Sequence, residues 1–232
     1  DFDAAAAEYA RSRELADREG LRSLAAQQDY NIAYLHFLRG KYTLALRLYR
    51  DARRHSVEIG DEYHAALCDL DQSEVYLDLN LIDESVNLAR GAAFRFRELG
   101  MRYEQAKAVT FAGIGEHSRE NNRQALVLFS KARSLFLQSR NPIWPAIVDF
   151  YRSILLRDLG QTKPALKLAA RAGRVFGAES PLGRVALVQV LIGEIALDGG
   201  RLEKALRSAE LATRGLNPDD HPMVFFHAEY LR

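Results

Sequence analysis

The sequence predicts an all-α solenoid of antiparallel helix pairs, and three observations support this prediction. Small residues recur with a period of 40 positions, and glycine, asparagine or proline interrupts the chain about every 20 positions. No stretch alternates apolar and polar residues over a length that indicates a β-strand. A fixed period of this size is typical of repeat architectures, in which each repeat buries its apolar face against its neighbours.

Four columns of small residues define the repeat. Helix backbones approach each other closely only where no large side chain intervenes, so these columns indicate helix crossings. Large apolar residues such as Leu46, Val86 and Leu126 run beside them at the spacing of an amphipathic helix. The columns are Ala45, Ser85, Ala125, Ala165 and Ala205; Ala52, Ala92, Ala132, Ala172 and Ala212; Ala33, Ser73, Gly113, Ser153 and Gly193; and Ala26, Ala66, Ala106, Ala146 and Ala186.

Chain breakers divide the sequence into helices of about 17 residues each, or about 25 Å. Most of these breakers tolerate the left-handed conformation that ends a helix, and Pro142 and Pro181 stand where proline starts one. The breakers are Gly20, Gly40, Gly60, Asn80, Gly100, Asn121 with Asn122, Asn141 with Pro142, Gly160, Ser180 with Pro181, and Gly199 with Gly200. We therefore expect one domain over 1–232, with a lone helix at 3–19, pairs at 21–59, 61–99, 101–140, 142–177 and 180–215, and a half pair at 221–232.

Composition favours a folded cytoplasmic protein. The residues are 48% hydrophobic and 27% charged, and the formal net charge of +1 provides no global field for nucleic acid or an anionic membrane. The single cysteine, Cys68, lies in an apolar stretch and is interpreted as a buried hydrophobe in a reducing compartment. No run is long enough to span a membrane and no signal peptide is evident, while the first residue, Asp1, and the unfinished final helix indicate a fragment of a longer polypeptide.

The second helices of the pairs resemble the tetratricopeptide repeat, which carries an alanine, an aromatic residue and another alanine at fixed spacing. Ala45, Tyr49 and Ala52 match this pattern, as do Ala125, Phe129 and Ala132. Other repeats place Ala89, Ala169 or Ala209 at the aromatic position, and the tryptophan and closing proline of the family pattern are absent.

Because the family period is about 34 residues, the chain most resembles the long variety found in kinesin light chains, cell-polarity adaptors and bacterial regulators. The segments 79–81 and 99–104 are also similar to bacterial arrays that precede a CHAT peptidase domain. The resemblance covers the whole chain.

The resemblance implies a right-handed superhelix whose concave groove is lined by the first helix of every pair. It implies a mostly apolar lining that suits an amphipathic segment or a peptide with apolar anchors. Two interpretations of the aromatic residues stay open, since they either anchor a ligand or pack between adjacent helices. The implied positions are Gln27, Tyr30, Tyr34 and Phe37; Leu67, Leu70, Glu74 and Leu77; Lys107, Thr110, Ile114 and His117; Ile147, Phe150, Ile154 and Arg157; and Leu187, Val190, Glu194 and Leu197.

No catalytic, cofactor or metal site is expected. The histidines show no zinc-protease spacing, and His55 and His64, which flank the turn at Gly60, supply only two ligands. Residues 113–115, Gly-Ile-Gly, lie in a small-residue column and are interpreted as packing. His64 is the one histidine at helical spacing from Cys68, and a reactive pair is the less favoured interpretation.

The charged residues leave two alternatives open. Asp29, Asp69 and Asp149 recur at the period, with Asp71 nearby, and either bond to neighbouring helices or present carboxylates to a ligand. Basic residues on the second helices are expected to form a solvated convex face, with a nucleic-acid track as the less favoured alternative. They are Arg11, Arg13, Arg53, Arg54, Arg171 and Arg174.

The leading functional hypothesis is a non-catalytic scaffold or regulatory module that binds a protein or peptide. The alternatives are a substrate-recruiting or gating region of a larger enzyme such as a CHAT-type peptidase, and the sensor region of a transcriptional regulator. Nucleic acid and membrane are not expected as partners of this segment. Self-association through Tyr9, or through Phe225 and Phe226, is expected if apolar faces are exposed at the ends.

Overall fold

The computed structural model describes residues 2–138, 141–179, 182–218 and 221–232, which contain twelve α-helices and no strand. The all-α prediction is confirmed. Among the described residues, none of the helices combines the length and the hydropathy that a membrane span requires.

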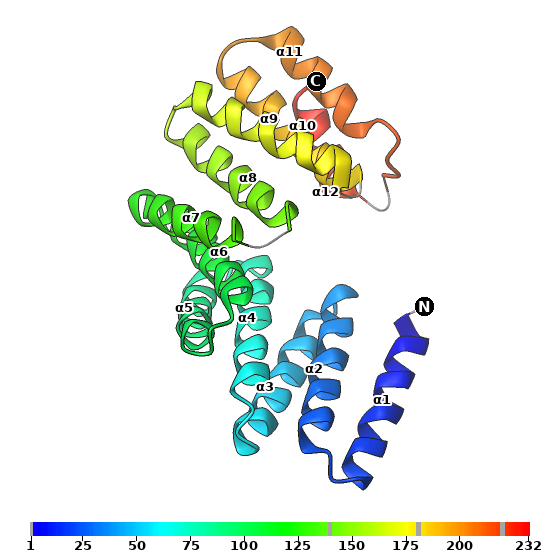
Figure 1. Cartoon of the computed structure of the whole chain (residues 1–232). Coiled ribbons are helices and arrows are strands. Elements are labelled where there is room, and N and C mark those ends of the chain that lie inside the picture. The colour runs from blue at the N-terminus through cyan, green and yellow to red at the C-terminus, as the bar shows by residue number, and fades with distance from the viewer. Residues whose placement is uncertain (1, 139–140, 180–181, 219–220) are drawn as a thin grey trace. The chain divides into compact units, whose positions relative to one another are not determined.

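The chain divides into two compact units, Asp1–Lys131 and Ala132–Arg232. Each unit consists of successive antiparallel helix pairs (Figure 1). The single domain over 1–232 stays a prediction. Unit 1 contains α1 (Phe2–Arg18), α2 (Arg22–Leu38), α3 (Tyr42–Glu58), α4 (Glu62–Asp78), α5 (Ile82–Glu98), α6 (Arg102–Ser118) and the first part of α7 (Asn122–Phe136). Unit 2 contains the end of α7, α8 (Ile143–Asp158), α9 (Thr162–Glu179), α10 (Leu182–Asp198), α11 (Leu202–Thr213) and α12 (Pro222–Tyr230).

The turns between helices contain most of the predicted breakers. Gly20, Gly40, Gly60, Gly100, Gly160 and Gly200 all have φ between 68° and 76°, and Asn80 has a φ of 56°. At the turn predicted for Asn121 and Asn122, the left-handed residue is Glu120, with a φ of 63°. The prediction was wrong by one residue there, because the 20-residue helix period places the cap at position 120 whatever its side chain. Pro142 precedes α8 directly, whereas Pro181 lies outside the described residues.

The small residues lie at buried helix crossings, as predicted. Ala45 and Ala125 are fully buried, and the column glycines Gly113 and Gly193 fit against the large side chains of Phe129 and Leu231. A Cβ atom added to Gly113 would lie 2.8 Å from the ring of Phe129, so this glycine lets α6 approach α7 closely. The Gly-Ile-Gly segment is therefore a packing feature.

The even-numbered helices form the inner row of unit 1. Helix α4 touches both α2 and α6, whereas no such contact joins α3 to α5 within unit 1. The inner row is consequently shorter than the outer row, and the unit curves toward the surface made by α2, α4 and α6. We call this surface the inner face.

Buried aspartates on the even-numbered helices hold pairs of outer helices together. Asp69 on α4 is 2% exposed and accepts hydrogen bonds from Arg53 on α3, at 2.6 Å, and from Arg95 on α5. We call this arrangement the aspartate clamp. It recurs as Asp29 with Arg13 and His55, and as Asp149 with Arg133 and Arg171.

The clamps decide between the alternatives that the charged residues left open. The recurring aspartates bond to neighbouring helices. The prediction of a solvated convex face was wrong for Arg13, Arg53 and Arg171, because each of these side chains pairs with a half-buried or buried carboxylate. Arg11 and Arg54 do lie in solvent, where they pair only with exposed carboxylates.

Two glycines on outer and inner helices give a matched test of the crossings. Gly113→Ala should lower the free energy of unfolding by about 1 to 3 kcal/mol, because the new methyl group overlaps Phe129. Gly91→Ala on α5 should raise it by about 0.5 to 1 kcal/mol, since the added Cβ meets nothing closer than 3.9 Å and glycine is a poor helix former. Urea unfolding of both variants measures the difference. A stabilising Gly113→Ala would contradict the close approach of α6 and α7.

Two adjacent arginines test the aspartate clamp. Arg53→Ala should lower the free energy of unfolding by about 1 to 3 kcal/mol, because it leaves buried Asp69 with one cation instead of two. Arg54→Ala should change it by less than about 0.5 kcal/mol, since its partner Asp51 is exposed. Thermal unfolding of the two variants side by side makes the comparison. Equal losses would show that the clamp carries no stability.

Candidate functional site

The inner face of unit 1 brings together most of the residues that the resemblance implied on α2, α4 and α6. Gln27 and Tyr34 are exposed, and the rest of the accessible set is partly exposed: Tyr30, Phe37, Leu67, Glu74, Leu77, Lys107, Ile114 and His117. Leu70 and Thr110 are fully buried, so they support the face from beneath. Thr110 donates its hydroxyl hydrogen bond to Ala106 O within its own helix.

Three aromatic side chains form a ladder along α2. Tyr34 stacks on Tyr30 with ring centroids 6.4 Å apart and an interplanar angle of 11°, and Phe37 lies 6.1 Å from Tyr34 on the other side. Tyr34 is 39% exposed, whereas Tyr30 and Phe37 also pack against the core around Tyr49. Tyr30 and Phe37 therefore fit the packing interpretation. Tyr34 is accessible, as the anchoring interpretation requires.

A buried carboxyl group connects this ladder to α4. The Tyr30 hydroxyl donates to Asp71 Oδ2 at 2.7 Å, and the buried Tyr49 hydroxyl approaches the same oxygen at 3.4 Å. Burial raises the pKa of Asp71, while Lys107 and the two hydroxyl groups oppose the shift. Burial also raises the pKa of Tyr30, so its hydroxyl stays a donor. Asp71 thus ties α2 to α4 beneath the face.

Glu74 lies one helical turn beyond Asp71 on α4. Burial is the main cause that raises the pKa of Glu74 to about 7, and the neighbouring Asp71 adds to the effect. Lys107 on α6 lowers the same pKa by its positive charge. The inner face therefore holds a carboxyl group that changes charge near neutral pH, next to an aromatic ladder and opposite a cation.

Sequence reasoning gave Asp71 only a general bonding role and missed Tyr49 as its second partner. The signal was present, because Tyr30 and Asp71 lie 41 residues apart, one repeat plus one residue. The same spacing joins Tyr63 to Glu104 and Arg157 to Asp198. A polar pair at this spacing bridges adjacent inner helices.

In unit 2, the implied residues on α8 and α10 form an ion-pair network. Arg157 donates to Glu194 and to Asp198, both at 2.6 Å, and His227 on α12 lies 3.3 Å from Glu194. Phe150 and Ile154 pack against the core of this unit, and Val190 is buried. Ile147 and Leu197 are partly buried, and Leu187 is exposed.

The histidines that flank Gly60 have structural partners, and Cys68 is buried. His55 Nδ1 lies 3.1 Å from Asp29, and His64 Nδ1 lies 2.8 Å from Asp61, so the two histidines serve different helix junctions. Burial raises the pKa of the Cys68 thiol, which is the opposite of what a nucleophile requires. Within the described ranges, no three histidine, cysteine, aspartate or glutamate side chains gather closely enough to hold a metal ion.

Several solved structures are similar to this chain. BtubC (BKLC) from P. vanneervenii matches with a TM-score of 0.74 at 17% identity, over 94% of each chain. A Rap protein complexed with Competence and Sporulation Factor matches with a TM-score of 0.72 at 16% identity, over 87% of this chain and 55% of that one. A third match is a Signal Transduction ATPase with Numerous Domains from Pyrococcus horikoshii, which has a tetratricopeptide repeat sensor. Its TM-score is 0.68 at 14% identity, over 89% of this chain and 30% of that one. No protein-family model and no curated protein matches the sequence.

These likenesses and the helix pairs together confirm the predicted fold, a tetratricopeptide-like array.

Glu74 should make stability depend on pH in a defined direction. The folded chain keeps the Glu74 proton up to about pH 7, whereas the unfolded chain releases it above about pH 4.5. The folded state therefore binds more protons in this interval, and Glu74 makes the free energy of unfolding fall as pH rises from about 4.5 to about 7. Glu74→Gln removes this loss, and the variant should exceed the natural chain by about 1 to 3 kcal/mol at pH 8.

Urea unfolding at pH 4 and pH 8 checks this prediction. At pH 4 the Glu74→Gln variant and the natural chain should unfold with similar free energies, because the carboxyl is protonated in both states. Glu84→Gln, at an exposed position of α5, is the control and should leave the pH dependence unchanged. A gain of the same size at both pH values would contradict a raised pKa for Glu74.

Proposed function

We propose that this chain is a non-catalytic scaffold or regulatory module that holds a protein or peptide segment on the inner face of unit 1. The observation that carries the proposal is the accessible edge of the aromatic ladder at Tyr34, set between the polar groups of neighbouring helices. Tyrosine is one of the residue types that are enriched among partner-binding anchors, since it offers a large rigid surface and a hydrogen-bonding tip.

The chemistry around Tyr34 defines the segment that the inner face accepts. Leu77 and Ile114 offer partly exposed apolar surface, while Lys107 and Glu74 supply one positive group and one group that is partly neutral near pH 7. A segment with an apolar anchor and few charges fits this lining better than a highly charged tail. An amphipathic helix is the simplest occupant.

The likeness in fold supports a binding role. The Rap protein that this chain resembles was crystallised as a complex with Competence and Sporulation Factor. A sensor region of a larger regulator is a second candidate, favoured by the likeness to the tetratricopeptide repeat sensor of the ATPase from Pyrococcus horikoshii. Both candidates use the same inner face.

We also propose that the protein is cytoplasmic. A buried, protonated Cys68 thiol suits a reducing compartment.

Selection of a random peptide library on the purified chain tests the proposal. Enriched peptides should carry an apolar anchor, and Tyr34→Ala should weaken them about tenfold or more in calorimetric titrations, because it removes the accessible anchor. Phe94→Ala is the control, since Phe94 is an exposed aromatic residue on the outer helix α5. Failure to enrich any peptide, or a loss that follows Phe94 and not Tyr34, would contradict binding at the inner face.

A further inference from the structure

The aspartate clamp is not present in every repeat. Gln189 and Gly173 stand at its positions on α10 and α9, and a second place that lacks it lies on α5 and α6. Val109 on α6 occupies the place of Asp29, Asp69 and Asp149, and Ala93 on α5 occupies the place of Arg13, Arg53 and Arg133. Both halves of the clamp are therefore replaced together by apolar residues. The small side chains fill less space than an arginine and an aspartate.

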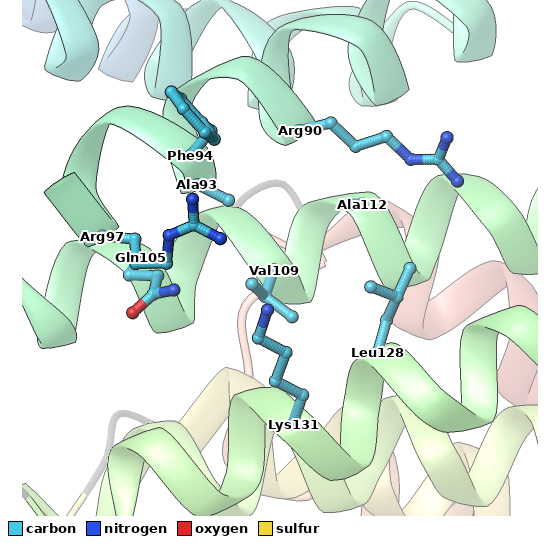
Figure 2. Close-up of a pocket in the computed structure, with 9 residues that line it drawn as sticks. All are labelled: Arg90, Ala93, Phe94, Arg97, Gln105, Val109, Ala112, Leu128 and Lys131. Carbon is cyan, nitrogen blue, oxygen red and sulfur yellow. The ribbon is translucent and has the colours of Figure 1, made fainter.

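A hollow of about 180 Å³ lies where the clamp is missing. Figure 2 shows that its walls come from three successive helices, α5, α6 and α7. Val109 and Ala112 form the floor, with Phe94 and Leu128 at the sides. Phe94 is 57% exposed, so the apolar wall is open to solvent on the side of α5.

Three cations surround the same hollow. Arg90 and Arg97 reach it from α5, and the Lys131 side chain rises from α7 toward Val109 (Figure 2). Gln105 is the one other polar residue in its lining, which contains no carboxylate. The hollow is therefore both apolar and positively charged.

Lys131 occupies the position of a clamp cation, although the aspartate of that clamp is replaced by Val109. It stands 22 residues after Val109, the same spacing that separates Asp149 from Arg171, and those two side chains form an ion pair at 2.6 Å. Lys131 forms no ion pair or hydrogen bond with any residue in the described part of the chain. Arg90 and Arg97 already lie 2.8 Å from Glu116 and 3.0 Å from Glu98, so Lys131 is the most available of the three.

We propose that this hollow is a second binding site, which accepts an acidic side chain of a partner peptide together with the apolar residue beside it. The carboxylate takes the place of the missing aspartate and pairs with Lys131. The adjacent apolar side chain covers Val109 and Leu128 and contacts the ring of Phe94. The site lies between α5, α6 and α7, and is therefore separate from the inner face of α2, α4 and α6.

The apolar walls distinguish this occupant from other anions. A free phosphate or a nucleic-acid backbone can pair with cations, but it leaves Phe94, Val109 and Leu128 uncovered. An acidic residue next to an apolar one satisfies both features at once. The charged part sets the orientation of the peptide and the apolar part supplies most of the buried surface.

Fluorescence anisotropy with a defined probe tests the proposal. The probe is a fluorescein-labelled, amide-capped pentapeptide of alternating leucine and glutamate, and its counterpart has glutamine in place of glutamate. At low ionic strength the acidic probe should bind about tenfold more tightly than its counterpart. Equal affinities for the two peptides, or no binding of either, would overturn the proposal. An oligonucleotide of similar length that competes as well as the acidic probe would overturn it too.

Charge variants locate the binding on the protein. Lys131→Glu should weaken the acidic probe about tenfold, whereas Lys167→Glu, at an exposed position of the outer helix α9, should leave it unchanged. The double variant Ala93→Arg with Val109→Asp rebuilds the clamp and should abolish binding, because its own carboxylate then pairs with Lys131. Circular dichroism establishes that each variant is folded.

Tyr34→Ala separates this site from the proposed function. It should leave the affinity of the acidic probe unchanged, since Tyr34 lies on the inner face. Loss of binding in Tyr34→Ala with full binding in Lys131→Glu would overturn the second site while supporting the inner face. The opposite pattern supports the second site whatever the outcome for the inner face.

Discussion

Buried or half-buried carboxylates that each bridge two outer helices are the interaction on which three of the helix junctions depend. Asp69 is almost fully buried, and moving a carboxylate out of water costs several kcal/mol unless positive groups offset the loss. The two arginines that offset it come from α3 and α5, the outer helices before and after α4. A shift of either outer helix by one residue would move its arginine away from Asp69. Such a shift is strongly disfavoured, because it leaves the buried carboxylate without one of its cations. The clamp therefore defines the register of three helices at once.

Small residues make this arrangement possible. Alanine and glycine at the crossings bring the backbones close enough for a single aspartate to reach arginines on both sides. The same close approach brings α4 into contact with both α2 and α6, which curves unit 1 toward its inner face. Accessible groups such as Tyr34 and partly buried ones such as Glu74 then lie side by side on a surface that three helices share. Packing in the small-residue columns thus has a direct effect on the chemistry of the inner face.

The sequence was sufficient to predict the helix pairs and their crossings, because small residues and chain breakers affect the backbone within a few residues of their own positions. It was less informative about the inner face. Leu70, Thr110 and Val190 share a column with Tyr30 and are buried, whereas the longer Tyr30 side chain is partly exposed and donates to Asp71 on the neighbouring helix α4. The large Phe150 side chain, in the same column, is partly exposed as well. Whether a residue in this column is exposed depends on how far its side chain extends beyond the contacts with neighbouring helices. The repeat pattern in the sequence does not contain this information.

The arginine and aspartate positions that recur at the repeat period predict more than their charge alone indicates. Arg53 and Arg54 are adjacent and chemically identical, yet one reaches a buried carboxylate and the other lies in solvent. Only the pairing of a column of arginines with a column of aspartates, 16 residues apart, distinguishes them. The same pairing makes the loss of the clamp at Ala93 and Val109 visible in the sequence.

Where the clamp is lost as a pair, no buried charge is stranded, and α6 keeps its place through the packing of Phe111 and Gly113. The free cation that remains costs little, because Lys131 is exposed and stays hydrated. An external carboxylate that approaches it gives up hydration as well, so one lysine alone cannot hold a partner. Two further cations and five apolar side chains in the same hollow change this balance. A repeat can therefore exchange a structural ion pair for a surface with binding chemistry without a change in its helical frame.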